Sequence, residues 1–146
     1  MLSGVRRCGK SVLLSQIKDE ILYLGKANEE HIIFINLEDF KFMSLNNANK
    51  LNSYINKLIK DDKKYFIFID EIQHINQFER VLASLKATEN VSLFITGSNS
   101  NLLSGKLAML LVGRCVEFKI MPFSYAEFLN FYLTNNLPLP KEPLVN

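Results

Sequence analysis

The sequence predicts one α/β domain in which a mostly parallel sheet of about five strands is covered by helices on both faces. Its 146 residues suit a single domain. Hydrophobic residues make up 48% of the chain and charged residues 22%, a balance typical of globular proteins and not of disordered ones. Short apolar runs alternate with segments of helical periodicity, and this alternation favours parallel strands joined by helices.

The first part of the chain predicts a helix, a strand and a second helix. Apolar residues recur at intervals of three and four over residues 11–24, and Gly25 is a natural end for that helix. The apolar run at residues 31–37 predicts a strand that is buried on both faces. Over residues 48–60, apolar side chains again recur at helical spacing, with Asn and Lys on the other side.

The middle of the chain predicts two more buried strands with a helix between them. Residues 65–69 form an apolar run that ends abruptly at two acidic residues. Asn76 and Glu79 resemble a capping box, which would open a helix that extends to about residue 86. Residues 91–96 form the third buried strand of the prediction.

The last part of the chain predicts a helix, a strand and a final helix. Leucines over residues 102–111 predict a short helix, and residues 115–120 predict a strand. Ser124 and Glu127 form a second capping box, which is expected to open the last helix.

Charge and cysteine content narrow the class of protein. A net charge of +2 provides no large surplus for wrapping a polyanion, so a nucleic-acid partner stays undecided. Cys8 and Cys115 are too few and too far apart for a disulfide framework or a spaced metal site. No apolar run approaches the ~20 residues that cross a bilayer, and the N-terminus has no apolar signal core. We expect a cytoplasmic protein without a membrane partner.

A phosphate-binding pattern directly precedes the first predicted helix. Residues 4–11 read Gly-Val-Arg-Arg-Cys-Gly-Lys-Ser, which fits GxxxxGK[ST]. In such a loop, backbone N–H groups surround the phosphates and the helix N-terminus adds positive potential. Lys10 is expected to reach the terminal phosphates, and Ser11 to offer its hydroxyl to Mg²⁺. The residues expected to bind the nucleotide are Gly4, Val5, Arg6, Arg7, Cys8, Gly9, Lys10, Ser11 and Val12.

Two acids and a polar cluster follow neighbouring apolar runs. Asp70 and Glu71 end one run and are expected to lie beside the phosphate loop. There Asp70 is expected to bind Mg²⁺, and Glu71 is expected to orient and deprotonate an attacking water. Thr96, Ser98 and Asn99 end the next run and are expected at the same sheet edge, near the γ-phosphate or the water. No guanine-reading NKxD motif occurs, which favours ATP over GTP.

Four segments of the chain together carry a family resemblance. They are GVRRCGKSVLL at residues 4–14, FIFIDEIQ at 66–73, LFITGSNS at 93–100 and LVGRCVEFKIMPFSYAEFL at 111–129. The chain resembles the AAA-like branch of P-loop ATPases, in particular the prokaryotic AAA-domain proteins of the archaeal ATPase type. The resemblance implies a three-layer P-loop fold in which the strand before Ser98 lies between the phosphate-loop strand and the strand before Asp70. It also implies ATP hydrolysis with Mg²⁺.

The resemblance also implies a role for individual residues. Lys10 and Ser11 correspond to the Walker A residues, Asp70 to the Walker B aspartate and Glu71 to the catalytic base.

The first sensor of the family corresponds to the stretch that starts at Thr96. Within it, Ser98 is the preferred residue, with Asn99 and Thr96 as alternatives. Arg114 stands where such ATPases can carry an arginine that approaches the nucleotide, in cis or across a subunit boundary. A plain surface arginine is the alternative.

The start and the end of the chain depart from the family pattern. Only three residues precede Gly4, so the first strand is expected to be truncated. We expect the ATPase domain at residues 1–134 and a proline-bearing tail or linker at residues 135–146. A C-terminal domain or protein partner outside this chain, and a homo-oligomer, are consistent with the family.

Two functions from different classes remain. The first is a Mg²⁺-dependent ATPase whose turnover drives a conformational change in an attached domain or partner. The second is a non-catalytic nucleotide-binding or interaction module, a truncated remnant. A kinase that uses the same loop is less favoured, because the position of Glu71 suits activation of water.

Overall fold

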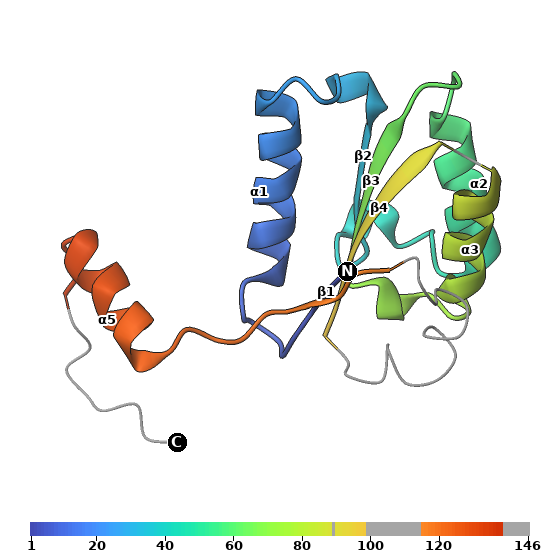
Figure 1. Ribbon diagram of the computed structural model, residues 1–146. Coiled ribbons are helices and arrows are strands. Elements are labelled where there is room, and N and C mark those ends of the chain that lie inside the picture. Colours follow the sequence, from blue (N-terminus) through green and yellow to red (C-terminus); the bar gives the residue numbers. More distant parts are fainter. Residues whose placement is uncertain (89, 99–114, 139–146) are drawn as a thin grey trace.

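Five parallel strands form one sheet in the order β2-β3-β4-β1-β5. The computed structural model describes residues 1–88, 90–98 and 115–138, and Figure 1 shows their arrangement. The strands are β1 (Leu2–Ser3), β2 (Ile32–Asn36), β3 (Tyr65–Asp70), β4 (Val91–Gly97) and β5 (Phe118–Lys119). Because β4 lies between β3 and β1, the strand order expected from the family resemblance is confirmed.

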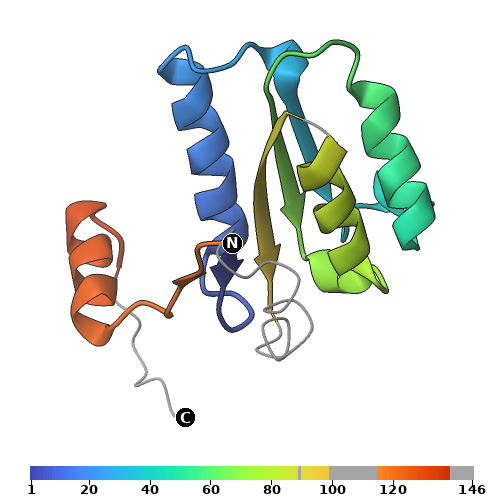
Figure 2. The same ribbon diagram turned by 45° about the vertical axis from the view of Figure 1, so that its right-hand side comes forward.

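Helices cover both faces of the sheet and complete the three layers that the sequence predicts. Helix α1 lies against one face, and α2 and α3 lie side by side against the other (Figures 1 and 2). The α-helices of the described residues are α1 (Lys10–Tyr23), α2 (Ala48–Leu58), α3 (Phe78–Thr88) and α5 (Tyr125–Thr134). Single turns of 3₁₀-helix occupy Glu29–His31, Phe40–Phe42 and Ile72–His74.

The two faces of the sheet carry different kinds of apolar side chain. Successive residues of a strand point to opposite faces. On the face toward α1, Phe68 is fully buried and stacks on Phe34 and Phe94, with ring centroids 6.0 and 4.8 Å apart. On the face toward α2 and α3, the core contains Ile67 and Ile69. On β3, Phe66 and Phe68 therefore face α1, whereas Ile67 and Ile69 face α2 and α3.

Two predicted elements differ from the structure. Helix α3 begins at Phe78, directly after Gln77, which has a positive φ of 60°. Asn76 is therefore not its N-cap residue, and the capping box expected there is wrong. The strand expected at residues 115–120 is reduced to Phe118–Lys119, because this exposed edge strand pairs with only the two residues of β1. The helix predicted at residues 102–111 lies outside the described residues.

Strand β1 lies between β4 and β5 and has two residues, so β4 extends beyond it. Leu2 pairs with Thr96 on one side and with Phe118 on the other. Because β4 is seven residues long, much of its β1-facing edge has no β1 residue opposite it. A cavity of about 250 Å³ lies there and is lined by side chains that include Leu2, Leu93 and Phe118.

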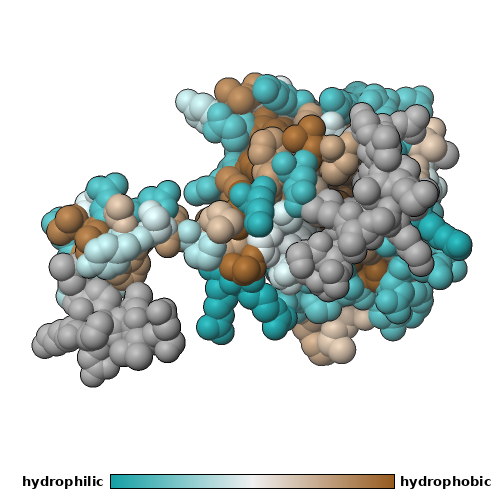
Figure 3. Space-filling model, turned by 60° about the horizontal axis from the view of Figure 1, so that its bottom comes forward, coloured by the Kyte–Doolittle hydropathy of each residue, from teal (hydrophilic) through white to brown (hydrophobic). Residues whose placement is uncertain are grey.

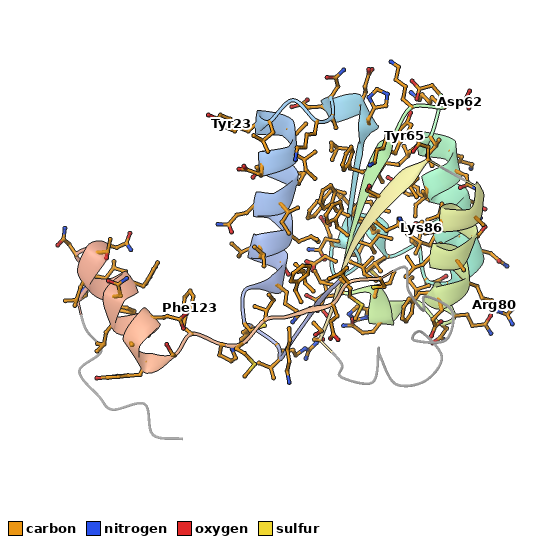
Figure 4. The ribbon with its side chains drawn as sticks, in the orientation of Figure 1. Tyr23, Asp62, Tyr65, Arg80, Lys86 and Phe123 are labelled. Carbon is orange, nitrogen blue, oxygen red and sulfur yellow. The ribbon has the colours of Figure 1, made fainter. Side chains whose placement is uncertain are left out.

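Helix α5 stands apart from the three layers. Ser124 accepts a hydrogen bond from the Glu127 amide and the Glu127 carboxylate accepts one from the Ser124 amide, so the predicted capping box is confirmed. No residue of α5 is buried, and Figure 3 shows the helix as a lobe beside the main body. Phe123 lies directly before the N-cap of this helix (Figure 4), and its ring stacks on that of Phe131, with centroids 6.3 Å apart. Within the described ranges, no helix is both long enough and apolar enough to cross a membrane.

Candidate functional site

The phosphate-loop sequence connects β1 to α1 and leaves the start of that helix open. Gly9 is the N-cap residue, with φ at 91°, and no side chain caps the helix through it. The first helical hydrogen bond joins the Leu13 amide to the Gly9 carbonyl at 2.9 Å. The amides of Lys10, Ser11 and Val12 therefore have no partner within the helix. Because the first turn contains no acidic residue, its positive potential is available to an anion.

Gly4 is required by the packing of the loop as well as by its conformation. Its φ is 148°, and a Cβ at this position would lie 2.2 Å from the carbonyl oxygen of Ile120. The Ile120 amide donates to the Ser3 carbonyl at 2.7 Å, so the chain beyond β5 is held directly against the start of the loop. Only glycine fits this close approach.

Lys10 is buried although it is cationic. Its side chain is 3% exposed, and Nζ donates to the carbonyl oxygens of Gly4 at 3.1 Å and Val5 at 2.9 Å. The same nitrogen lies 3.9 Å from Glu71 Oε1. The ammonium group is therefore held at the centre of the loop, where a phosphate would be surrounded by the amides of the first helical turn.

Asp70 ends β3 at the carboxyl edge of the sheet. Tyr65 begins the same strand at the opposite end, where Figure 4 labels it. By the alternation along β3, Asp70 follows Phe66 and Phe68 on the face toward α1. The side chain is 2% exposed, and its Oδ1 accepts a hydrogen bond from the Thr96 hydroxyl.

Glu71 turns sharply away from the strand and is held by three polar groups. Its φ and ψ are 56° and 50°, the left-handed region that residues with a Cβ rarely adopt. The Glu71 amide donates to Thr96 Oγ1 at 2.9 Å. The Glu71 carboxylate oxygen Oε2 accepts hydrogen bonds from the Ser98 hydroxyl at 2.9 Å and from the Gln73 amide.

The surroundings of Glu71 keep its carboxyl group ionised. Burial of this side chain, which is 8% exposed as a residue, would by itself raise the pKa. Hydrogen bonds from Gln73 and Ser98 and the positive charge of Lys10 act in the other direction and outweigh burial. The pKa of Glu71 is therefore lowered from its ordinary value, and the group is a carboxylate at neutral pH.

The residues at this site fit a nucleotide with Mg²⁺. A magnesium ion in such sites takes few protein ligands and keeps water and phosphate oxygens around it. Ser11 offers an exposed hydroxyl at the start of α1, and Asp70 offers a buried carboxylate on the same face of the sheet. In the part of the chain that the structure describes, no three His, Cys, Asp or Glu side chains gather into a metal site of their own.

The structure brings together five of the residues singled out by sequence. Lys10, Asp70, Glu71, Thr96 and Ser98 meet at one edge of the sheet through the contacts given above. Of the expected nucleotide-binding residues, those with exposed side chains are Val5, Arg6, Arg7, Ser11 and Val12, and Cys8 is half-buried. Asn99 and Arg114 lie outside the described residues.

Sequence reasoning missed two sets of contacts. Gln73 reaches both Glu71 and Ser98, with its Nε2 3.0 Å from Ser98 Oγ. Glu38 lies 3.8 Å from Arg6 of the loop and 3.8 Å from His74. Position in the chain gives no signal for these contacts, since both depend on how turns beyond the strand ends fold back.

Comparison with known proteins identifies a family. The sequence pattern of the AAA domain matches residues 1–129. A Haemophilus influenzae protein is 43% identical over 131 residues, which is 89% of this chain, and a Methanocaldococcus jannaschii protein is 32% identical over 131 residues, or 90%. Both relatives are named only as uncharacterized proteins. This chain spans 32% and 28% of their respective lengths.

The fold is also similar to that of a solved protein. The structure of the Aeropyrum pernix ORC1 protein in complex with DNA has a TM-score of 0.59 to this chain at 14% sequence identity. The match covers 92% of this chain and 42% of that chain. At this level of identity the similarity concerns the fold alone.

Proposed function

This chain belongs to the AAA domain family, and from this premise we propose that it binds ATP with Mg²⁺ and hydrolyses the bond between the β- and γ-phosphates. The observation that carries the proposal is the ion pair between Lys10, at the open start of α1, and Glu71, which directly follows Asp70 at the end of β3. We further propose that turnover drives a conformational change in an attached domain or a partner protein.

Binding of ATP is assigned to the loop and the first turn of α1. Lys10 provides a fixed positive charge for the terminal phosphates, and the amides of Lys10, Ser11 and Val12 donate hydrogen bonds to phosphate oxygens. Ser11 and Asp70 hold Mg²⁺, which supplies charge neutralisation at the transferred phosphoryl group. The backbone of the loop, from Gly4 to Gly9, surrounds the phosphates.

Hydrolysis is assigned to Glu71. Its Oε1 faces Lys10 at 3.9 Å, and its Oε2 is occupied by Ser98 and Gln73. In the proposed step, Glu71 accepts a proton from water, the water oxygen forms a bond to the γ-phosphorus, and the bond to the β–γ bridging oxygen breaks to leave ADP and phosphate. Ser98, which touches the base directly, is the preferred sensor of the γ-phosphate.

The test is a paired measurement of ATP affinity and phosphate release on the same protein, with and without Mg²⁺. We expect Mg²⁺-dependent binding and hydrolysis above the rate of buffer alone. Binding without any hydrolysis would support the non-catalytic nucleotide-binding module instead. Absence of binding would contradict the ATPase and the nucleotide-binding module and would leave an interaction module.

A further inference from the structure

We infer that Gln73 is a positioning residue that holds Glu71 with Oε1 directed toward the phosphate loop, so that Oε1 receives the proton of the attacking water. The inference rests on the proposed hydrolysis of ATP. It adds to that proposal a residue to which neither the phosphate-loop pattern nor the acidic pair assigns a role.

The contacts of Gln73 divide the two oxygens of the Glu71 carboxylate between different tasks. Oε2 accepts from Gln73 Nε2 and from the Ser98 hydroxyl. Ser98 Oγ also accepts from Gln73 Nε2 at 3.0 Å, so the three groups form a closed triangle. Oε1 lies outside this triangle, 3.9 Å from Lys10 Nζ. With Oε2 occupied, Oε1 is the oxygen left to face the loop.

The orientation of the Gln73 amide follows from the chemistry of its neighbours. Nε2 faces two oxygen acceptors, and exchange of the amide nitrogen and oxygen would place an acceptor against a carboxylate. In this orientation Gln73 Oε1 is buried and has no donor among the described residues. A buried acceptor without a partner is unfavourable. The unpaired Oε1 of Gln73 is therefore unfavourable, whereas its Nε2 makes hydrogen bonds to Glu71 and Ser98.

The backbone brings these side chains together. Residues two apart on a regular strand share a face but point away from the strand in parallel. Here Glu71 adopts a left-handed conformation and the 3₁₀ turn Ile72–His74 follows at once. This turn folds the Gln73 side chain back onto Glu71. The left-handed backbone at Glu71 and the hydrogen bonds from Gln73 and Ser98 thus both fix the position of the Glu71 carboxylate.

The kinetic test compares Gln73→Met with Gln16→Met. Both substitutions replace an amide by an apolar chain of similar length, and Gln16 is exposed on α1. We expect Gln73→Met to lower kcat about tenfold while KM for ATP changes less than about twofold, as for a residue that acts in the chemical step. Gln16→Met should leave both constants unchanged. An unchanged kcat in Gln73→Met overturns the inference.

A second background separates positioning from a structural role. If Gln73 acts through the Glu71 carboxylate, Gln73→Met should cause no further loss in a Glu71→Gln protein, because residues that act as a unit are not additive. A further loss of similar size would mean that Gln73 supports the fold and would overturn the inference.

A measurement without turnover distinguishes failure of this inference from failure of the proposed function. The side-chain amide resonances of Gln73 in ¹H–¹⁵N spectra should move on Glu71→Ala, whereas those of Gln16 should stay. Unmoved Gln73 resonances would show that the contact with Glu71 does not form, and would overturn the inference. Absence of ATP hydrolysis by the wild-type protein would overturn the proposed function. The spectra would then still show whether Gln73 contacts Glu71.

Discussion

The hydroxyl of Thr96 on β4 donates a hydrogen bond to the carboxylate of Asp70 at the end of β3. The hydroxyl oxygen of Thr96 also accepts a hydrogen bond from the Glu71 amide at 2.9 Å. Thr96 is fully buried, so water does not compete for these bonds. Thr96 therefore holds two groups in place: the carboxylate of Asp70, which is expected to bind Mg²⁺, and the backbone of Glu71, the expected base.

Two substitutions of Thr96 should distinguish the effect of its hydroxyl from the effect of its side-chain shape. Thr96→Val keeps the shape but leaves two buried groups unsatisfied, at about 1–3 kcal/mol each in the free energy of unfolding. Thr96→Ser keeps the hydroxyl and loses one methyl group, worth about 0.8 kcal/mol or somewhat more. We expect Thr96→Ser to retain hydrolysis and Thr96→Val to lose at least about 90% of it. Urea unfolding and phosphate release check the pair, and equal behaviour of the two variants would contradict the role of the hydroxyl.

Replacement of Lys10 should abolish nucleotide binding. Lys10→Ala removes the fixed cation of the loop and leaves the carbonyl oxygens of Gly4 and Val5 without their donor. We expect ATP affinity to fall by at least about 100-fold, since hydrogen bonds between charged groups are the strong ones. Calorimetry of ATP binding measures the change, and Lys57→Ala on the exposed side of α2 is the matched control. Equal affinity in Lys10→Ala would rule out the assignment.

The two acids after β3 should respond differently to loss of charge. Glu71→Gln should keep ATP bound and slow single-turnover hydrolysis by at least the ~10²-fold typical of a lost general base. Asp70→Asn should instead weaken the Mg²⁺-dependent part of ATP binding. Affinity measured with and without Mg²⁺, next to single-turnover rates, distinguishes these effects. Normal hydrolysis in Glu71→Gln would mean that another group activates the water.

The buried ring of Phe68 should contribute strongly to the stability of the α1 side of the sheet. Phe68→Ala removes a fully buried ring that stacks on Phe34 and Phe94, and we expect it to lower the free energy of unfolding by about 3–5 kcal/mol. Phe40 is 83% exposed, so Phe40→Ala should change stability by less than about 0.5 kcal/mol. Chemical unfolding followed by circular dichroism checks both. A small effect of Phe68→Ala would mean that the ring stack adds little to the core.

The N-terminus of α5 should loosen in acid. Hydrogen bonds from the Ser124 amide and hydroxyl lower the pKa of Glu127 from its ordinary value. The carboxylate therefore stabilises the cap above the ordinary pKa, and this contribution is lost as pH falls through the lowered pKa of the folded helix. Amide exchange in the first turn of α5 should rise over that range, with an NMR titration of Glu127 as the reference. Ser124→Ala removes the hydroxyl but keeps the amide, so it should return the Glu127 pKa part of the way toward its ordinary value, and an unchanged pKa would contradict the contribution of the hydroxyl.

The buried elements could be predicted from the sequence because each carries its own local signal. Strands β2, β3 and β4 are apolar runs, and the phosphate loop and the acids at the end of β3 are contiguous motifs. Of these strands, only β3 is buried throughout, and the expectation that the strand at residues 31–37 is buried on both faces is wrong, because β2 lies at the edge of the sheet and alternates between buried and half-buried residues. The start of α3 could not be predicted, because the positive φ of Gln77 is set by the preceding turn. Strand β5 is exposed, so its length depends on pairing with β1 and not on its own composition.

The contacts within the site depend on relations that the sequence pattern does not contain. The bond between Thr96 and Asp70 requires the register that pairs Ile69 with Ile95. The contact between Gln73 and Glu71 requires a left-handed residue followed by a 3₁₀ turn. Composition and periodicity identify which residues lie at the sheet edge, but they do not say which of them touch.

The placement of Phe66 and Phe68 on one face of β3 and of Ile67 and Ile69 on the other has a consequence for folding errors. A shift of the register of β3 by one residue would exchange its two faces. The rings of Phe66 and Phe68 would then be forced against α2 and α3, and the smaller isoleucine side chains would leave voids against α1. The same error would turn Asp70 away from the phosphate loop. A misfolded chain of this kind would therefore be unstable and would lack the proposed Mg²⁺ site. The difference in size between Phe and Ile thus protects the site against a wrongly paired but otherwise compact sheet.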